Sequence, residues 1–187
     1  METFINKDKL FIDEEVLKSM LPSSRQVTDT QTIYYCISMA QNQTLKNILG
    51  VDFYNDIVTD YTSYIDSGTA MSTCYTTLMN DYLKVILSLM SYKRLITTLS
   101  YKLRDGGLRT TLDANSDLTT SGEMGSMKQE ITADIDGFIV DMKTYISENV
   151  SCFPLYTNGF AGVGSDSVNL SIGKVQNPGK SIYNNYR

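Results

Sequence analysis

The sequence predicts a mainly α fold: a small helical bundle of four main helices, with a short β-like excursion and an extended C-terminal arm. Apolar residues recur every three or four positions through most of residues 28–152, which is the period of an amphipathic helix. Glycine and proline fall near the ends of these stretches, where helices stop. Residues 153–187 lack this period and hold five of the 12 glycines, a composition that does not form a core of its own.

Three helices are expected in the first part of the chain. A brief helix covers residues 14–20, where Asp13 supplies the side-chain oxygen that caps a helix start. A main helix covers residues 28–49, and Gly50 suits the left-handed conformation that commonly follows a helix end. The second main helix covers residues 52–65, with aromatic and aliphatic residues recurring on one face.

The longest helix is expected over residues 73–103. Its middle is apolar nearly all round, so this helix is predicted to be the buried central rod of the bundle. Residues 104–125 contain turn residues and β-tolerant residues, and form a possible hairpin or loop. The fourth main helix covers about residues 126–152, and its start is open between two capping boxes, one beginning at Thr120 and the other at Ser126.

The length fits one domain, residues 1–152, followed by the arm, residues 153–187. The domain carries 20 acidic against 13 basic residues, which argues against binding of nucleic-acid phosphates as its main role. The chain has no histidine, which removes the commonest general base and most transition-metal sites. Three widely spaced cysteines, Cys36, Cys74 and Cys152, are predicted to be reduced thiols in a cytosolic setting.

Two motif-like segments fail as ligand sites. Residues 113–117 open like a calcium-binding loop, but Leu118 stands at the position of the turn glycine and Met124 at that of the bidentate glutamate. Residues 125–128 are similar to a phosphate-binding loop, yet the upstream glycine is missing and no strand precedes them. No catalytic residue, metal or cofactor is therefore predicted. The longest apolar run is also too short to cross a bilayer, so no membrane partner is expected.

The last two main helices differ in charge. Residues 84–109 carry six basic residues against Asp105, and residues 113–148 carry eight acids against two lysines. Helix-end electrostatics accounts for part of the basic excess, and solvation is the ordinary fate of carboxylates on a helix face. The remainder indicates two complementary faces that meet between copies of the protein. The candidate inter-subunit residues are Lys84, Lys93, Arg94, Lys102, Arg104, Arg109, Glu130, Asp134, Asp141 and Glu148.

Aromatic and aliphatic residues recur in the arm although it has no core to join, so they are expected to anchor on a partner. Val168, Leu170 and Ile172 alternate with polar residues, which predicts one lone strand that needs a sheet edge to pair with. The candidate partner-binding residues of the arm are Phe153, Tyr156, Phe160, Val168, Leu170, Ile172, Tyr183 and Tyr186.

The order and spacing of four landmarks resemble those of the head–tail connector proteins (adaptor, or head-completion, proteins) of tailed bacteriophages, especially ring proteins of the crAss-like kind. The resemblance covers about residues 10–156. The landmarks are Ile33…Ala40…Leu45, Ile48-Leu49-Gly50-Val51-Asp52-Phe53-Tyr54, Lys102-x-x-x-Gly106-Gly107-Leu108 and Tyr145-Ile146…Asn149…Phe153-Pro154-Leu155-Tyr156.

The resemblance implies a helical domain without catalysis, in a virion protein that is assembled in the host cytoplasm and located in the phage neck. Copies would form a ring, typically twelvefold, that contacts the portal protein and further ring or tail proteins. DNA would pass through the lumen without specific binding. An acidic lumen is consistent with that role, because it would repel phosphates and let DNA slide.

Two other functions stay open at the level of sequence. The chain could be a soluble helical adaptor or regulatory module that binds one partner protein through its tail. It could also be an enzyme that uses carboxylates of the last helix, provided that a pocket encloses at least two of Glu130, Asp134 and Asp141. Particle size separates the ring from the adaptor, since a closed ring would have a mass of several hundred kilodaltons.

Overall fold

The computed structural model describes residues 7–21, 27, 29–104, 107–110 and 121–156, which form a mainly helical protein. The predicted mainly α class is therefore confirmed. The elements in chain order are the 3-10 turn η1 (Lys7–Lys9), α1 (Glu14–Met20), α2 (Thr30–Met39), the π-helical turn η3 (Ala40–Leu45), α3 (Lys46–Leu49), α4 (Val51–Ser67), α5 (Thr73–Thr77), the π-helical turn η4 (Leu78–Leu83), α6 (Lys84–Ser100), β1 (Tyr101–Arg104), β2 (Gly107–Thr110), α7 (Ser121–Glu148) and the 3-10 turn η5 (Val150–Cys152).

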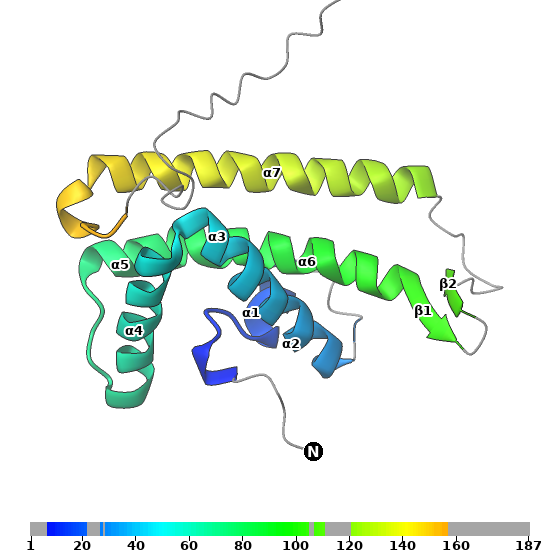
Figure 1. The fold of residues 1–187 in the computed structure, drawn as a ribbon, viewed down its shortest axis with the longest axis horizontal. Helices are drawn as coiled ribbons and strands as arrows, with labels where there is room; N and C mark the ends of the chain where they lie inside the picture. The colour runs from blue at the N-terminus through cyan, green and yellow to red at the C-terminus, as the bar shows by residue number, and fades with distance from the viewer. Residues whose placement is uncertain (1–6, 22–26, 28, 105–106, 111–120, 157–187) are drawn as a thin grey trace, which may run out of the picture.

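Helix α6 lies in the middle of the fold. It packs against α1 and α2 on one side, and α7 runs along its other side (Figure 1). Leu83, Ile86 and Leu87 are fully buried, as expected for the central rod that the apolar pattern predicted. Because α6 contacts both halves of the bundle, most of its described side chains are buried or half-buried, and the exposed ones lie at its C-terminal end.

Side-chain caps fix where the helices begin. Asp13 accepts a hydrogen bond from the backbone N–H of Val16 at 2.8 Å, so the predicted start of α1 is confirmed. Asp29 caps α2 in the same way. Helix α7 begins at Ser121, next to the earlier of its two predicted capping boxes, and Ser126 lies inside the helix.

Two π-helical turns interrupt helices that the sequence predicts as plain α. In η3 the N–H of Lys46 donates to the carbonyl of Gln41, and in η4 the N–H of Lys84 donates to the carbonyl of Met79. Both bonds span five residues instead of four. The apolar period on either side of each turn remains that of an α-helix, and for this reason the pattern did not reveal them.

The predicted end of the longest helix is wrong by one turn. The helix stops at Ser100, and Tyr101 to Arg104 form strand β1, which pairs antiparallel with β2. Arg104 pairs with Gly107, and the two residues between them in the sequence, Asp105-Gly106, lie outside the described residues. Asp-Gly is a dipeptide that two-residue hairpin connections favour, and this local signal outweighs the helical period of the residues before it.

The segment before α1 belongs to the core, although no periodic pattern marks it. Leu10, Phe11 and Ile12 are all buried. The side chain of Gln41, which is 1% exposed, holds this segment in place. Its Oε1 accepts from the N–H of Phe11 at 2.8 Å, and its Nε2 donates to the carbonyl of Lys9 at 2.9 Å.

The expectation of three reduced thiols is wrong for two of them. Cys74 and Cys152 form a disulfide that links α5 to η5 across 78 residues of sequence. Their Cα atoms are 6.2 Å apart, within the usual range for a disulfide. Cys36 is a free, buried cysteine, and burial raises the pKa of its thiol. Spacing alone could not show the pair, because it is made by the return of α7 to α5.

The expected boundary between the domain and the arm lies too early in the chain. Phe153 is 1% exposed and belongs to the core, so it is not available to a partner as predicted. Its ring centroid lies 5.7 Å from that of Phe53 and 5.4 Å from that of Tyr75. Tyr156 is half-buried and packs on Phe53 as well. The aromatic pattern around Pro154 therefore closes the bundle, and the other predicted arm residues lie outside the described residues.

Candidate functional site

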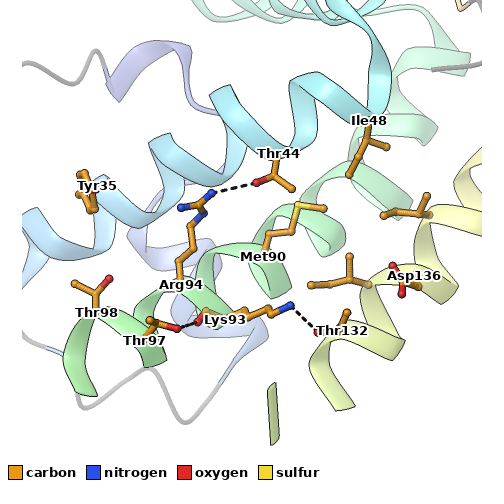
Figure 2. Close-up of a pocket in the computed structure, with 12 residues that line it drawn as sticks. Tyr35, Thr44, Ile48, Met90, Lys93, Arg94, Thr97, Thr98, Thr132 and Asp136 are labelled. Atoms are coloured by element: carbon orange, nitrogen blue, oxygen red, sulfur yellow. Dashed lines mark hydrogen bonds between the residues drawn. The ribbon is translucent and has the colours of Figure 1, made fainter. Parts of the chain in front are cut away.

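A groove of about 520 Å³ opens at the surface where three helical segments meet. The α2–η3–α3 segment forms one wall, α7 forms the other, and α6 forms the floor (Figure 2). The lining residues are Tyr35, Thr44, Ile48, Met90, Lys93, Arg94, Thr97, Thr98, Thr132, Ile135, Asp136 and Ile139.

Two neighbouring cations on α6 point to opposite walls of the groove. The guanidinium of Arg94 donates to Thr44 Oγ1 at 3.3 Å, and Lys93 Nζ donates to Thr132 Oγ1 at 2.6 Å (Figure 2). They diverge because successive residues on an α-helix are about 100° apart. All these acceptors are neutral oxygens, as is Gln43 Oε1, which lies 3.5 Å from Arg94.

Both cations therefore keep their charge available to a ligand. In the described part of the chain, the ion pairs at 4.0 Å or less comprise the Lys18–Glu14 contact on α1, and no carboxylate lies that close to Lys93 or Arg94. Asp136 is on the rim of the groove but is exposed and not paired with either of them. A charge that is only partly buried and bound to hydroxyl groups attracts an anion.

Apolar side chains from the floor and both walls line the groove beside these cations. Met90 and Ile135 are buried, while Ile48 and Ile139 are half-buried. The groove thus offers positive charge at one end and an aliphatic surface at the other. Such a surface is suited to acidic side chains.

The predicted basic face is only partly described by the structure. Lys93 and Arg94 lie together in the groove, whereas Lys84 Nζ donates to Asn80 Oδ1 one turn earlier on the same helical segment. The side chains of Lys102, Arg104 and Arg109 lie outside the described residues. Sequence reasoning missed Thr44 and Thr132, because a threonine that accepts a hydrogen bond from a distant cation leaves no pattern in the chain.

The four predicted acids of α7 share one flank of the helix. Glu130, Asp134, Asp141 and Glu148 are all exposed, and we refer to them as the acidic flank. None of them lines the groove or the second hollow described below. The sequence-level requirement for an enzyme, a pocket enclosing at least two of these carboxylates, is therefore not met by either hollow.

The second hollow, of about 620 Å³, lies at the C-terminal end of α7. Val140 and Val150 on its rim are 61% and 64% exposed, and Tyr156, the last described residue, also lines it. An apolar rim of this kind beside the start of the arm is a second candidate for contact with another chain.

A hydrogen-bonded group joins α4 to α5. The hydroxyl of Tyr75 donates to Asp56 Oδ2, and Asp60 lies one turn further along α4 with a buried Oδ2 that has no hydrogen-bond partner among the described residues. Burial, and then the charge of Asp56, raises the pKa of Asp60. Burial, and then the hydrogen bond to Asp56, raises the pKa of Tyr75.

The buried tyrosines should make the fold sensitive to alkali. Burial raises the pKa values of Tyr54, Tyr61 and Tyr156 as well as that of Tyr75. A tyrosine whose pKa is higher in the folded state than in the unfolded chain contributes to stability at pH values below its unfolded pKa of about 10. This contribution is lost as the pH rises through the higher pKa of the folded state.

We therefore expect the free energy of unfolding in urea to fall most steeply above pH 10. The raised pKa of the buried Cys36 thiol adds a smaller decrease that begins at about pH 8.5. In Tyr75→Phe the decrease above pH 10 should be smaller, because one of the responsible hydroxyl groups is gone. Tyr35→Phe, at a position that is 50% exposed, is the matched control and should behave like the parent protein. A curve that is flat up to pH 11 would contradict the role of these hydroxyls.

Among the described residues, no group of three or more His, Cys, Asp or Glu side chains is arranged to hold a metal ion. Nor does any helix in the described part of the chain have the length and apolar character needed to span a membrane. Residues 113–117, which open like a calcium loop, lie outside the described residues. Residues 125–128 are part of α7.

The described structure is mainly helical, and its two described hollows are open grooves at the surface. The chain belongs to the "Family of unknown function (DUF6712)", whose model matches residues 45–161. The match begins within η3, at Leu45. It therefore includes all of α7, which forms one wall of the groove, and Leu45 to Leu49 of the other wall. No curated protein and no solved structure matches the chain.

Proposed function

We propose that this chain is a structural virion protein, a subunit of an oligomeric ring in the neck of a tailed bacteriophage. In this role it bridges the portal protein and the tail components and surrounds the passage for DNA. Its part in assembly is mechanical, with no catalysis and no cofactor. The C-terminal arm, from residue 157 onward, extends from the bundle and anchors on neighbouring chains.

The observation that carries this proposal is how the landmarks of the resemblance meet in space. The segment around Phe53 and the segment from Phe153 to Tyr156 are about a hundred residues apart in sequence, and their rings pack edge to face at 5.7 and 5.3 Å. The residues that carry the resemblance to the connector proteins thus form one cluster that closes the bundle, and this supports the proposal.

The charge of the domain supports the same role. Acidic residues exceed basic ones in residues 1–152, so a ring of such domains repels DNA phosphates and does not trap them. The proposed contacts between copies use the basic residues of α6 and the acidic flank of α7. Exposed ion pairs are worth only about 0–1 kcal/mol each, so they set the register of the copies more than the strength of the contact.

The size of the particle tests the proposal. With a chain of 21.0 kDa, a ring of about twelve copies has a mass on the order of 250 kDa. We expect native mass spectrometry and negative-stain images of the protein, alone or mixed with a portal protein, to give a closed ring. A monomer or dimer that binds one partner protein and never forms a ring would favour the adaptor function instead.

Deletion of residues 157–187 separates the role of the arm from that of the domain. We expect the truncated chain to keep its helical circular dichroism and cooperative unfolding, because the described core ends at Tyr156. It should no longer assemble stably with its neighbours. A chain whose arm is replaced by Gly and Ser residues of the same number is the control for length. Unfolding of the truncated chain would show that the arm is part of its own core.

A further inference from the structure

Helix α7 has two flanks, one on each side of its core-facing stripe: one borders the groove that holds the α6 cations, and the other is the acidic flank. At about 100° per residue, Thr132, Asp136 and Ile139 lie on the flank that borders the groove. The acidic flank lies on the opposite side of the helix, about 180° away. The residues of α7 that are buried between the two flanks are Ile131, Ile135, Met142 and Ile146.

This arrangement prevents the two charged surfaces from meeting within one chain. The groove cations Lys93 and Arg94 face one side of α7, and the carboxylates of the acidic flank face the other side. Two surfaces that are complementary but lie on opposite sides of a subunit can join only between copies, in a head-to-tail contact. In a pair joined this way, one copy keeps an unused flank and the other keeps an unused groove, so the contact repeats.

We propose that the groove is the receiving half of a contact between two copies of this chain, and that Glu130 and Asp134 of the second copy enter it. This inference rests on the proposed ring and names the interface within it. Glu130 and Asp134 are four residues apart, which places their Cβ atoms about 5–6 Å apart on one helix face. Lys93 and Arg94, each held by a neutral hydroxyl acceptor, provide one cation for each carboxylate.

Charge reversal on each half of the contact tests the inference. The groove variant carries Lys93→Glu and Arg94→Glu, and the flank variant carries Glu130→Lys and Asp134→Lys. Sedimentation velocity on the full chain at low salt should show self-association that is weaker by about tenfold or more for each variant alone. For the parent protein, raising the salt concentration should weaken association in the same direction.

Mixing the two variants in equal amounts gives the decisive result. In a head-to-tail contact, the acidic groove of the first variant faces the basic flank of the second, and the unchanged groove of the second faces the unchanged flank of the first. Both kinds of contact are then complementary, so we expect the mixture to associate as the parent protein does. A mixture that associates no better than its components would overturn the inference, as would a parent protein that stays monomeric at all concentrations.

Matched reversals at exposed positions away from the groove control for net charge. Lys7→Glu with Lys9→Glu matches the groove variant, and Glu15→Lys with Asp66→Lys matches the flank variant. Both control chains should associate like the parent protein. Thermal unfolding followed by circular dichroism checks that every variant is folded, so a loss of association is assigned to the surface.

Further outcomes separate this inference from the ring itself. If images show closed rings for the parent protein and for both charge variants, the ring stands and the interface is wrong. If the parent forms chains or dimers that the mixture restores, the interface stands and the ring is wrong. If the groove variant loses binding to duplex DNA while its self-association is unchanged, the groove binds phosphate and the inference fails.

Discussion

Phe53→Ala should destabilise the protein by about 3–5 kcal/mol, which is the usual cost of emptying a buried phenylalanine site. Phe53 is 1% exposed, and its ring packs against those of Tyr75, Phe153 and Tyr156. These three neighbours come from α5 and from the end of the described chain. The substitution therefore removes the side chain that holds the C-terminal end of the bundle against α4, and leaves a cavity that aromatic rings cannot easily fill.

Chemical denaturation at neutral pH measures this effect directly. Tyr64→Ala on the same helix is the control, since Tyr64 is 47% exposed and its removal should change the free energy of unfolding by about 0.5 kcal/mol or less. We also expect the arm to be cut more rapidly by protease in Phe53→Ala, because its attachment to the bundle is loosened. Equal stability of the two variants would contradict the central position of the aromatic cluster.

Gln41→Leu should cost about 3 kcal/mol even though leucine has a similar size and is more apolar. Gln41 is buried, and its amide group serves the backbone N–H of Phe11, the carbonyl of Lys9 and the hydroxyl of Tyr54, the last at 3.1 Å. Leucine would leave at least one buried donor without a partner, and an unsatisfied buried donor typically costs about 1–3 kcal/mol. Looser packing of residues 10–12 would add to this loss.

Gln43→Leu provides the comparison, because Gln43 is exposed and lies two residues further along the same turn. It should change the stability by about 0.5 kcal/mol or less. Hydrogen exchange adds a local measurement: the amide of Phe11 should lose its protection in Gln41→Leu and keep it in Gln43→Leu. A Gln41→Leu protein as stable as the parent would mean that the N-terminal segment is not held by this side chain.

The sequence predicted those parts of the fold that depend on neighbouring residues. The capping oxygen of Asp13 and the apolar residues of α6 act within one or two turns, so pattern and structure agree there. The wrong predictions concern positions where two local signals compete, or where the contacts are made by residues far apart in the sequence. At Tyr101 the hairpin signal that follows outweighed the helical period, and at Phe153 an aromatic residue after a helix was assigned to the arm when it belongs to the core.

The candidate site was predictable only in part for the same reason. The excess of cations on α6 and of acids on α7 is visible in the sequence, and so is the common face of the four carboxylates. That Lys93 and Arg94 lie in a groove, bound to Thr132 and Thr44, depends on the packing of three segments that are distant in the chain. The position of the groove relative to the acidic flank likewise requires knowing which stripe of α7 is buried.

The π-helical turn η3 has a consequence for how relatives of this chain can differ in length. A π turn holds one residue more than an α turn. It therefore behaves as a single-residue insertion that the helix absorbs while the residues before and after it keep their core-facing sides. A relative lacking one residue between positions 40 and 45 would keep the core faces of α2 and α3. It would also rotate the equivalent of Gln41 away from the N-terminal segment, so a gap here should be inherited together with changes near Phe11.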